Sequence, residues 1–340
     1  MRVSTGLKLG LLAFATGAAL ATFMPAQSSA LVIVHCAGRH GVELGLGTNE
    51  KSAGIHMIDP IVQRGDAMSM HEHQFFGFGD WDKLANKSLA NYSDLLGGRT
   101  SCDLPKDSAA YWAPVLRKND GSLVKIQRME SYYRPWNSGK VDNLKQTQVM
   151  PPDLRMVAGN AKAVSAADVN RKTITWSCGN FSSKAQRLGH MYPSAIEADC
   201  STATGTSYLT VAVRYPTCWD GMLNDHTMLG NTADFSGTIP SPVKQHLTYK
   251  TSKGCPAGYP IKLPELTMNT SWDYRGNGKD LVLSSGSIYS YHADFLNAWD
   301  PAFFKQMVDT CINVDIPRDQ EPTLHFNYPE VCGPPIKQPN

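Results

Sequence analysis

The chain has 340 residues, of which 42% are hydrophobic and 18% are charged. The charged fraction lies below the ~25% usual for soluble domains, which argues against a disordered chain held open by its charges. The formal net charge is +2, and Arg2 and Lys8 account for the excess of basic residues. The rest of the chain is neutral, which argues against nucleic acid as a partner, because such a partner requires a surface that neutralises phosphates.

The first 30 residues have the three-part pattern of a secretory signal peptide. Arg2 and Lys8 form a basic start, Leu9 to Phe23 is an apolar run, and Ser28 to Ala30 supplies small residues for a signal peptidase. The apolar run is shorter than the ~20 residues of a membrane-spanning helix. We therefore predict cleavage after Ala30, secretion to the extracellular space, and no membrane association after cleavage.

The cysteines support this interpretation. All eight lie beyond Ala30, and no CxxC pair occurs among them. An even number of cysteines in an oxidising compartment predicts four disulfides, and the missing CxxC pairs exclude zinc-ribbon and thioredoxin-like sites. The sequence does not fix the pairing. Cys36 and Cys332 lie near the two ends of the mature chain, and a disulfide between them is one option.

Several short segments alternate apolar and polar residues, contain β-branched or aromatic side chains, and are separated by turn-forming residues. This pattern predicts a mainly β fold, an antiparallel β-sandwich or jelly roll, rather than βαβ units. Two segments have helical periodicity instead. In chain order we expect a strand at 123–129, a helix at 161–170, strands at 173–178, 208–215 and 281–283, a helix at 301–311 and a strand at 323–328.

No internal repeat or linker divides the chain. We therefore expect one disulfide-stapled domain with a few short helices, catalytic or binding, over residues 55–315. The signal peptide covers residues 1–30, an N-terminal extension residues 31–54, and a Pro-rich C-terminal extension residues 316–340. We expect the mature protein to be a monomer.

The usual enzyme signatures are missing from the sequence. It has no GxSxG elbow, no Walker A loop and no dinucleotide-binding glycine pattern. His71-Glu72-His73 begins like the HExxH motif of metalloproteases, but Phe75 stands where the second histidine is required. A metalloprotease helix is therefore excluded.

Two pairs of residues have a spacing that suits a functional site. His71 and His73 are two residues apart, as are His292 and Asp294. On a strand, such side chains project from the same face about 7 Å apart, so each pair can present two groups to one place. The four residues predict a site for one divalent transition metal, namely zinc, copper or manganese. Without a metal, a histidine oriented by Asp294 would act as a general acid or base.

His226 is the fifth candidate for catalysis, because it follows the segment Cys218 to Gly221 and would be held near a disulfide. An isolated His-x-His is common on ordinary surfaces, so packing or surface exposure is the alternative interpretation of all five residues. The remaining histidines lack such spacing and are interpreted as structural or surface residues.

Aromatic residues in Gly-, Asn- and Asp-rich surroundings indicate a sugar-binding cleft, because pyranose faces stack on aromatic rings. We assign substrate binding to Trp112, Tyr133, Trp219 and Tyr291, with burial in the core as the alternative. Five acidic residues could supply the carboxylate pair of a glycosidase. They are Glu72, Asp80, Asp82, Glu130 and Asp220.

Several segments match a known family in order. They include Asp59-Pro60-Ile61-Val62, Ser69 to Gly77, Cys218-Trp219-Asp220-Gly221, Cys255-Pro256 and His292 to Asp300. Together they resemble the secreted family filed as domain of unknown function nineteen ninety-six, found in fungi and some bacteria, over about residues 59 to 311.

The resemblance implies an extracellular protein. Some fungal members are joined to WSC or cellulose-binding modules, which implies polysaccharide or cell-wall surroundings. The family's His-x-His and His-x-Asp motifs correspond to His71, His73, His292 and Asp294. Tyr259 replaces the histidine of the family's Cys-Pro-x-x-His-Pro segment, which would alter the site if that histidine belonged to it.

Three functional hypotheses result. The first is a secreted hydrolase or lyase that acts on polysaccharide or cell-wall glycan. Its catalytic residues would be His71, His73, His226, His292 and Asp294. The second is a non-catalytic extracellular protein that binds glycan or metal. The third is a secreted structural or effector protein in which the histidines only pack.

Overall fold

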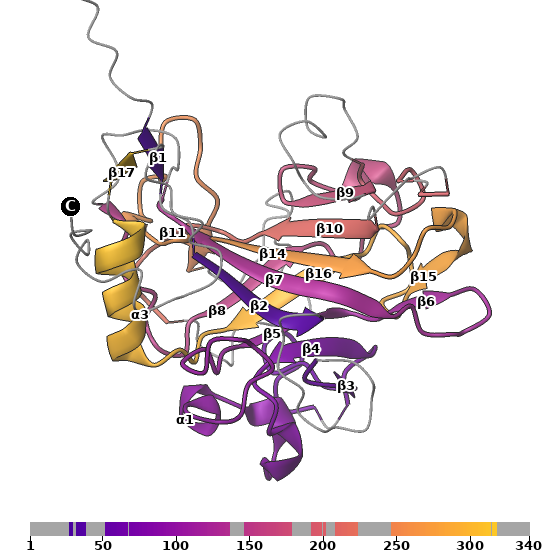
Figure 1. Ribbon diagram of the computed structural model, residues 1–340, viewed down its shortest axis with the longest axis horizontal. Helices are drawn as coiled ribbons and strands as arrows, with labels where there is room; N and C mark the ends of the chain where they lie inside the picture. Colours follow the sequence, from indigo (N-terminus) through magenta and orange to yellow (C-terminus); the bar gives the residue numbers. More distant parts are fainter. Residues whose placement is uncertain are drawn as a thin grey trace, which may run out of the picture.

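The computed structural model describes residues 27–29, 32–38, 52–66, 68–136, 146–178, 192–198, 200–201, 208–223, 246–313 and 315–317. In these ranges the protein is mainly antiparallel β-sheet. Two five-stranded sheets pack face to face around one large apolar core (Figure 1). The predicted antiparallel sandwich is confirmed.

The first sheet shows the alternation expected of a sheet with one buried face. In β10, Leu209, Val211 and Val213 belong to the core, while Thr210 and Arg214 lie on the other face. Such alternation made the strands at 173–178 and 208–215 predictable. The strand order is β2 (Val32–Gly38), β7 (Ile126–Arg134), β14 (Glu265–Trp272), β10 (Leu209–Arg214) and β9 (Ile174–Cys178).

The second sheet is buried on both faces. Phe76 and Tyr111 point into the core between the sheets, whereas Phe75 and Trp112 join a second apolar cluster on the opposite face. Helix α1 (Tyr92–Leu95) and neighbouring turns cover that face (Figure 1). The strand order is β3 (Ile55–His56), β4 (His73–Gly77), β5 (Ala110–Pro114), β16 (His292–Leu296) and β8 (Arg155–Gly159).

Smaller elements surround the sandwich. A three-stranded sheet contains β12 (Leu247–Thr248), β11 (Cys218–Trp219) and β13 (Ile261–Lys262). The two-stranded sheets are β15 (Leu281–Leu283) with β6 (Leu116–Lys118), and β1 (Gln27–Ser29) with β17 (Asp315–Pro317). Short 3-10 turns are η1 (Trp81–Lys83), η2 (Lys87–Leu89), η4 (Ala166–Asp168) and η5 (Gly278–Asp280).

One of the two predicted helices forms. Helix α3 (Pro301–Met307) continues as a π-helical turn, η6 (Val308–Ile312), at one end of the sandwich. Its start follows the usual capping rules, because the Asp300 side chain accepts from the Phe303 N–H at 2.9 Å and proline follows the cap. The helix predicted at 161–170 was wrong. Ser165 and Asp168 bond to each other's backbone there and close the short turn η4.

The N-terminal stretch after the predicted signal peptide contributes to the sandwich. Strand β2, in the predicted extension 31–54, pairs with β7 along the sheet edge. The option of a Cys36–Cys332 disulfide was wrong, because β2 brings Cys36 to Cys102, with Cα atoms 3.7 Å apart. The other disulfides with both partners described are Cys178–Cys200 and Cys218–Cys255, and Cys311 is also disulfide-bonded.

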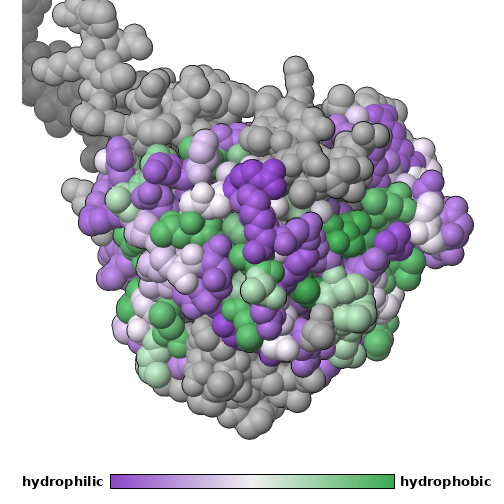
Figure 2. Space-filling model, turned by 90° about the horizontal axis from the view of Figure 1, so that it is seen from below, coloured by the Kyte–Doolittle hydropathy of each residue, from purple (hydrophilic) through white to green (hydrophobic). Residues whose placement is uncertain are grey.

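Some predictions fall on residues whose structure is not described. They are most of the signal peptide, the strand at 323–328 and His226. Among the described residues, no helix is long and apolar enough to cross a membrane. On the face seen from the side of α1, hydrophilic and hydrophobic residues are interspersed (Figure 2).

Candidate metal centre

The candidate site lies on the face of the second sheet that points away from the core. His73 and His292 are the first residues of β4 and β16, and β5 runs between these two strands. The register places Pro114 of β5 opposite His73 and places Trp112 opposite Asp294. Residues opposite each other share a face, so His73, His292 and Asp294 lie on one face of the sheet.

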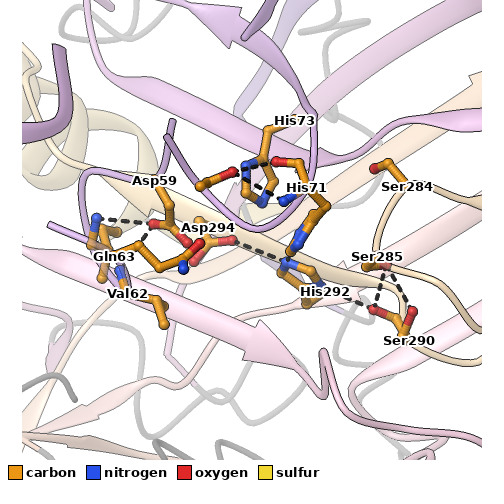
Figure 3. Close-up of polar contacts among 12 residues, drawn as sticks. Asp59, Val62, Gln63, His71, His73, Ser284, Ser285, Ser290, His292 and Asp294 are labelled. Carbon is orange, nitrogen blue, oxygen red and sulfur yellow. Dashed lines mark hydrogen bonds and ion pairs between the residues drawn. The ribbon is translucent and has the colours of Figure 1, made fainter. Parts of the chain in front are cut away.

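Three imidazoles meet at this place. The Nε2 atoms of His71 and His292 are 3.3 Å apart. The ring centre of His73 lies 4.3 Å from that of His71 and 5.7 Å from that of His292. Each ring offers one nitrogen, and the three nitrogens lie within 4.8 Å of one another. Figure 3 shows the rings pointing toward one another, His73 from β4, His71 from the segment just before it and His292 from β16.

Backbone carbonyls fix the orientation of two of the rings. The Nδ1 of His73 lies 2.9 Å from the Ile58 carbonyl oxygen, and the Nδ1 of His292 lies 2.9 Å from the Ser290 carbonyl oxygen. A carbonyl oxygen only accepts, so each Nδ1 carries the proton and each Nε2 carries a lone pair; the Nε2 of His292 faces the Nε2 of His71. The Nε2 of His73 is buried and has no hydrogen-bond partner in the described part of the chain. This is the arrangement of metal-binding histidines, whose second nitrogen is usually held by a carbonyl or carboxylate.

Burial keeps the imidazoles neutral. It lowers the pKa of His292 to about 3 and the pKa of His73 well below its usual value, and the adjacent imidazoles add to both effects. Burial also lowers the pKa of His71, which is only half-buried and forms the edge of the cluster that solvent reaches. The lone pairs are therefore available at neutral pH without competition from protons.

Two buried carboxyl groups stand beside the imidazoles. The Oδ2 of Asp294 lies 4.0 Å from the Nε2 of His292, and neither Asp294 oxygen has a hydrogen-bond partner among the described residues. Burial and the nearby Asp59 carboxylate raise the pKa of Asp294 well above its usual value. Asp59 accepts from the N–H groups of Ile61 at 3.0 Å and Val62 at 2.9 Å, while burial raises its pKa to about 6.

Sequence reasoning did not select Asp59 as a site residue. The signal that could have found it was its place at the start of the Asp-Pro-Ile-Val segment, since no spacing rule connects it with the histidines. The structure brings it beside Asp294 and the histidine cluster (Figure 3).

The donor set fits a transition metal. Ligand nitrogens at about 2.05 Å from a tetrahedral ion stand about 3.3 Å from one another, which matches the distance between His71 and His292. The buried lone pair of His73 and the oxygens of Asp294 are the groups that a cation would satisfy. Three imidazoles suit zinc or copper better than manganese, which prefers oxygen ligands.

The residues predicted to bind substrate lie mostly in the interior. Trp112 and Tyr133 are 0% exposed and Tyr291 is 1% exposed. Trp112 stacks on Phe75 with ring centres 5.2 Å apart. These three rings therefore have no free face for a sugar, and they stabilise the two apolar clusters instead. Trp219 is half-buried, and its role in substrate binding stays a prediction.

The five acidic residues proposed for a glycosidase pair each contact a basic side chain. These contacts account for their positions without a catalytic role. The pairs are Glu72 with Arg117, Asp80 with Arg99 and Lys83, Asp82 with Lys87, Glu130 with His35 and Arg128, and Asp220 with His246.

Comparison with known families identifies the domain. A family model described as Domain of unknown function (DUF1996) matches residues 59–299. The chain belongs to this family. The DUF1996 match contains His71, His73, His292 and Asp294 and extends across both sheets. Neither the curated proteins nor the solved structures gave a match.

Tyr259 stands where the resemblance to DUF1996 proteins leads us to expect a histidine. It lies just before β13, in the small three-stranded sheet rather than in the second sheet of the sandwich. The substitution therefore leaves the cluster of His71, His73 and His292 intact.

Proposed function

We propose that this DUF1996 protein is a secreted metalloenzyme that acts on extracellular or cell-wall polysaccharide as a hydrolase or lyase. The observation that carries the proposal is the convergence of the His71, His73 and His292 imidazoles, two of them fixed by backbone carbonyls. Three protein ligands that leave one position open are typical of catalytic zinc sites. An ion held in this way supplies a polarised water at neutral pH.

Side chains near the proposed ion would supply substrate access, proton transfer and local charge. His71 is the partly exposed ligand, so substrate would approach from its side of the cluster. Asp294 lies next to His292 and would hold or pass on a proton at its carboxyl oxygens. Asp59, fixed by two backbone N–H groups, would set the charge beside Asp294.

The metal we propose is zinc or copper. Imidazole is a good ligand for both. Met68 and Met70, in the segment that leads to His71, are 63% and 80% exposed. Thioethers are good ligands for copper in its reduced state, so methionines in the segment that leads to His71 make copper an alternative to zinc.

The polysaccharide substrate rests on two further arguments. The disulfides suit an oxidising, extracellular compartment, where the signal-like N-terminal segment would direct the chain. The resemblance to secreted proteins fused to WSC or cellulose-binding modules connects the family with cell-wall surroundings.

A non-catalytic metal-binding protein is the second candidate function. It is favoured by the position of Asp294, whose Oδ2 lies 4.0 Å from the His292 Nε2. A small movement would make this carboxylate a fourth ligand, and four protein ligands are typical of structural sites without a reactive position.

Elemental analysis of the purified secreted protein, combined with a polysaccharide panel, tests both candidates. We expect about one zinc or copper per chain, its loss from His73→Ala and His292→Ala, and its retention by the control His246→Ala, just before β12. Reducing ends or unsaturated products released by the wild type alone support the enzyme. Metal without products from any polysaccharide favours the binding protein. No metal in the wild type, even after incubation with zinc or copper salts, refutes the metal centre.

A further inference from the structure

A second site lies on the outer face of the first sheet, on the opposite side of the sandwich core from the histidine cluster. A cavity of about 800 Å³ opens there, lined by outward-facing residues of β7, β14 and β10 and by the segments that flank them. This volume lies within the roughly 300–1,000 Å³ of small-molecule sites. None of its lining residues belongs to the second sheet, so the cavity is independent of the candidate metal centre.

The lining of this cavity is basic. Five cationic side chains and two acidic ones line it, an excess of three positive charges in a chain whose net charge is only +2. An anionic ligand therefore finds complementary charge here rather than on the protein as a whole. The cationic residues are Arg128, Arg134, Lys172, Arg214 and Lys250, and the acidic ones are Glu130 and Glu265.

The two acids are already engaged with part of this charge. Glu130 accepts from the Tyr132 hydroxyl at 2.6 Å and pairs with Arg128 at 3.3 Å. Glu265 forms an ion pair with Lys250. The charge on the other cationic groups is therefore only partly compensated by these carboxylates.

Arg214 and Arg134 add positive charge that the Glu265 carboxylate offsets only in part, because Glu265 also forms an ion pair with Lys250. Arg214 donates to the Lys172 carbonyl oxygen at 3.4 Å and to the Thr175 hydroxyl at 3.3 Å, both neutral acceptors. Burial lowers the pKa of Arg214, and repulsion from Arg134 lowers it further. Two guanidinium groups that repel each other in a partly buried wall are stabilised by an anion placed between them.

Neutral hydrogen-bonding groups complete the lining. Thr217 is 6% exposed, and its hydroxyl has no hydrogen-bond partner in the described part of the chain. The same holds for the buried Oδ1 of Asn269. A buried polar atom without a partner costs free energy unless a ligand or water satisfies it. Thr and Asn side chains recur around the cavity, namely Asn170, Thr173, Thr210, Thr217, Thr267 and Asn269.

We propose that this cavity binds an anionic oligosaccharide of uronic acid residues. Guanidinium groups match carboxylates in a two-bonded geometry, which Arg134 and Arg214 would supply. The Thr and Asn side chains suit the many hydroxyl groups of sugars, which a sulfate ion lacks. The proposal does not depend on a metal or on the proposed catalysis, because it concerns a separate face of the protein.

Titration calorimetry on the full secreted protein tests this site, with a short oligogalacturonide as the probe. Neutral cello-oligosaccharide, a sulfated oligosaccharide of similar length and inorganic sulfate are the comparison ligands. We expect saturable binding of the oligogalacturonide, at least tenfold weaker binding by Arg214→Gln and by Arg134→Gln, and unchanged binding by the control Lys83→Gln at an exposed position. A tenfold loss corresponds to about 1.4 kcal/mol.

Lys172→Gln keeps the test valid if an arginine variant does not fold, because Lys172 is exposed and its replacement should weaken binding without disturbing the core. Equal binding of neutral and uronate oligosaccharides would overturn the proposal. So would equal or tighter binding of the sulfated ligand, or full binding by the Arg214, Arg134 and Lys172 variants. Retained uronate binding in His73→Ala and His292→Ala would show that this site stands apart from the metal centre.

Discussion

The buried carboxyl group of Asp59 gives a prediction whose size follows from the structure. Burial raises its folded-state pKa from 3.8 to about 6. Below pH 3.8 the folded and unfolded states both carry the proton, so the burial has no pH-dependent cost. Between pH 3.8 and 6 the unfolded chain ionises and the folded chain does not, so stability falls as the pH rises. Above pH 6 the cost is constant at about 3 kcal/mol, from about 1.4 kcal/mol per pKa unit.

Asp59→Asn removes this cost and keeps the local hydrogen bonds, because an asparagine Oδ1 can still accept from Ile61 and Val62. We expect the variant to be more stable than the wild type by about 3 kcal/mol at pH 8, with the difference vanishing below pH 3.8. Asp66→Asn makes the same chemical change at an exposed position of the same segment and serves as the matched control.

Urea unfolding at several pH values between 3.5 and 8 (~0.5 apart) measures this difference, with a chelator present so that no metal alters the carboxyl groups. The reasoning is refuted if Asp59→Asn is no more stable than the wild type at pH 8. A difference that stays the same down to pH 3.5 would also refute it, because the effect would then not arise from ionisation.

Further predictions concern metal, acid, a disulfide and a tight turn. Zinc or copper at a free concentration of 100 times its dissociation constant should stabilise the protein by about 2.7 kcal/mol, and a chelator should reverse the increase in melting temperature. Folded His292 has a pKa of about 3 and stays neutral in mild acid, while the same residue of the unfolded chain takes up a proton. Without metal, the unfolding free energy of the wild type should therefore fall by about 1.4 kcal/mol per pH unit relative to His292→Asn as the pH decreases from 6.5 toward 3. Parallel pH profiles of the two proteins in urea unfolding would contradict this. Replacing both Cys36 and Cys102 by alanine should cost about 2–5 kcal/mol in unfolding free energy, and an unchanged urea midpoint would speak against it. Gly77→Ala should cost about 3 kcal/mol or more in a thermal melt, since φ is +76° and the new Cβ would lie 2.0 Å from the Ala109 carbonyl oxygen; a wild-type melting temperature would contradict this.

The sequence predicted the parts of the molecule that obey local rules. Strands β9 and β10 alternate polar and apolar residues because only one face of the first sheet is buried. The spacing of His71 with His73 and of His292 with Asp294 predicted side chains on one face of each strand, and the structure shows three of these side chains meeting.

Other parts depend on distant neighbours and were missed for that reason. Strands β4, β5 and β16 are buried on both faces, so their sequences lack alternation. Trp112 sits in such a strand, and the local sequence does not distinguish a ring inside a double-sided sheet from a ring in a binding cleft. The helix predicted at 161–170 does not form, because Ser165 and Asp168 make local side-chain hydrogen bonds that compete with helical ones.

The histidine cluster joins parts of the chain that are far apart in sequence, since His71 and His292 are 221 residues from each other. The complete cluster is therefore absent from any nascent chain that has not yet been synthesised as far as β16. Loss of bound metal would then report disruption of the native fold anywhere between β4 and β16. A proteolytic fragment that ends before β16 should retain at most the two ligands of the first motif.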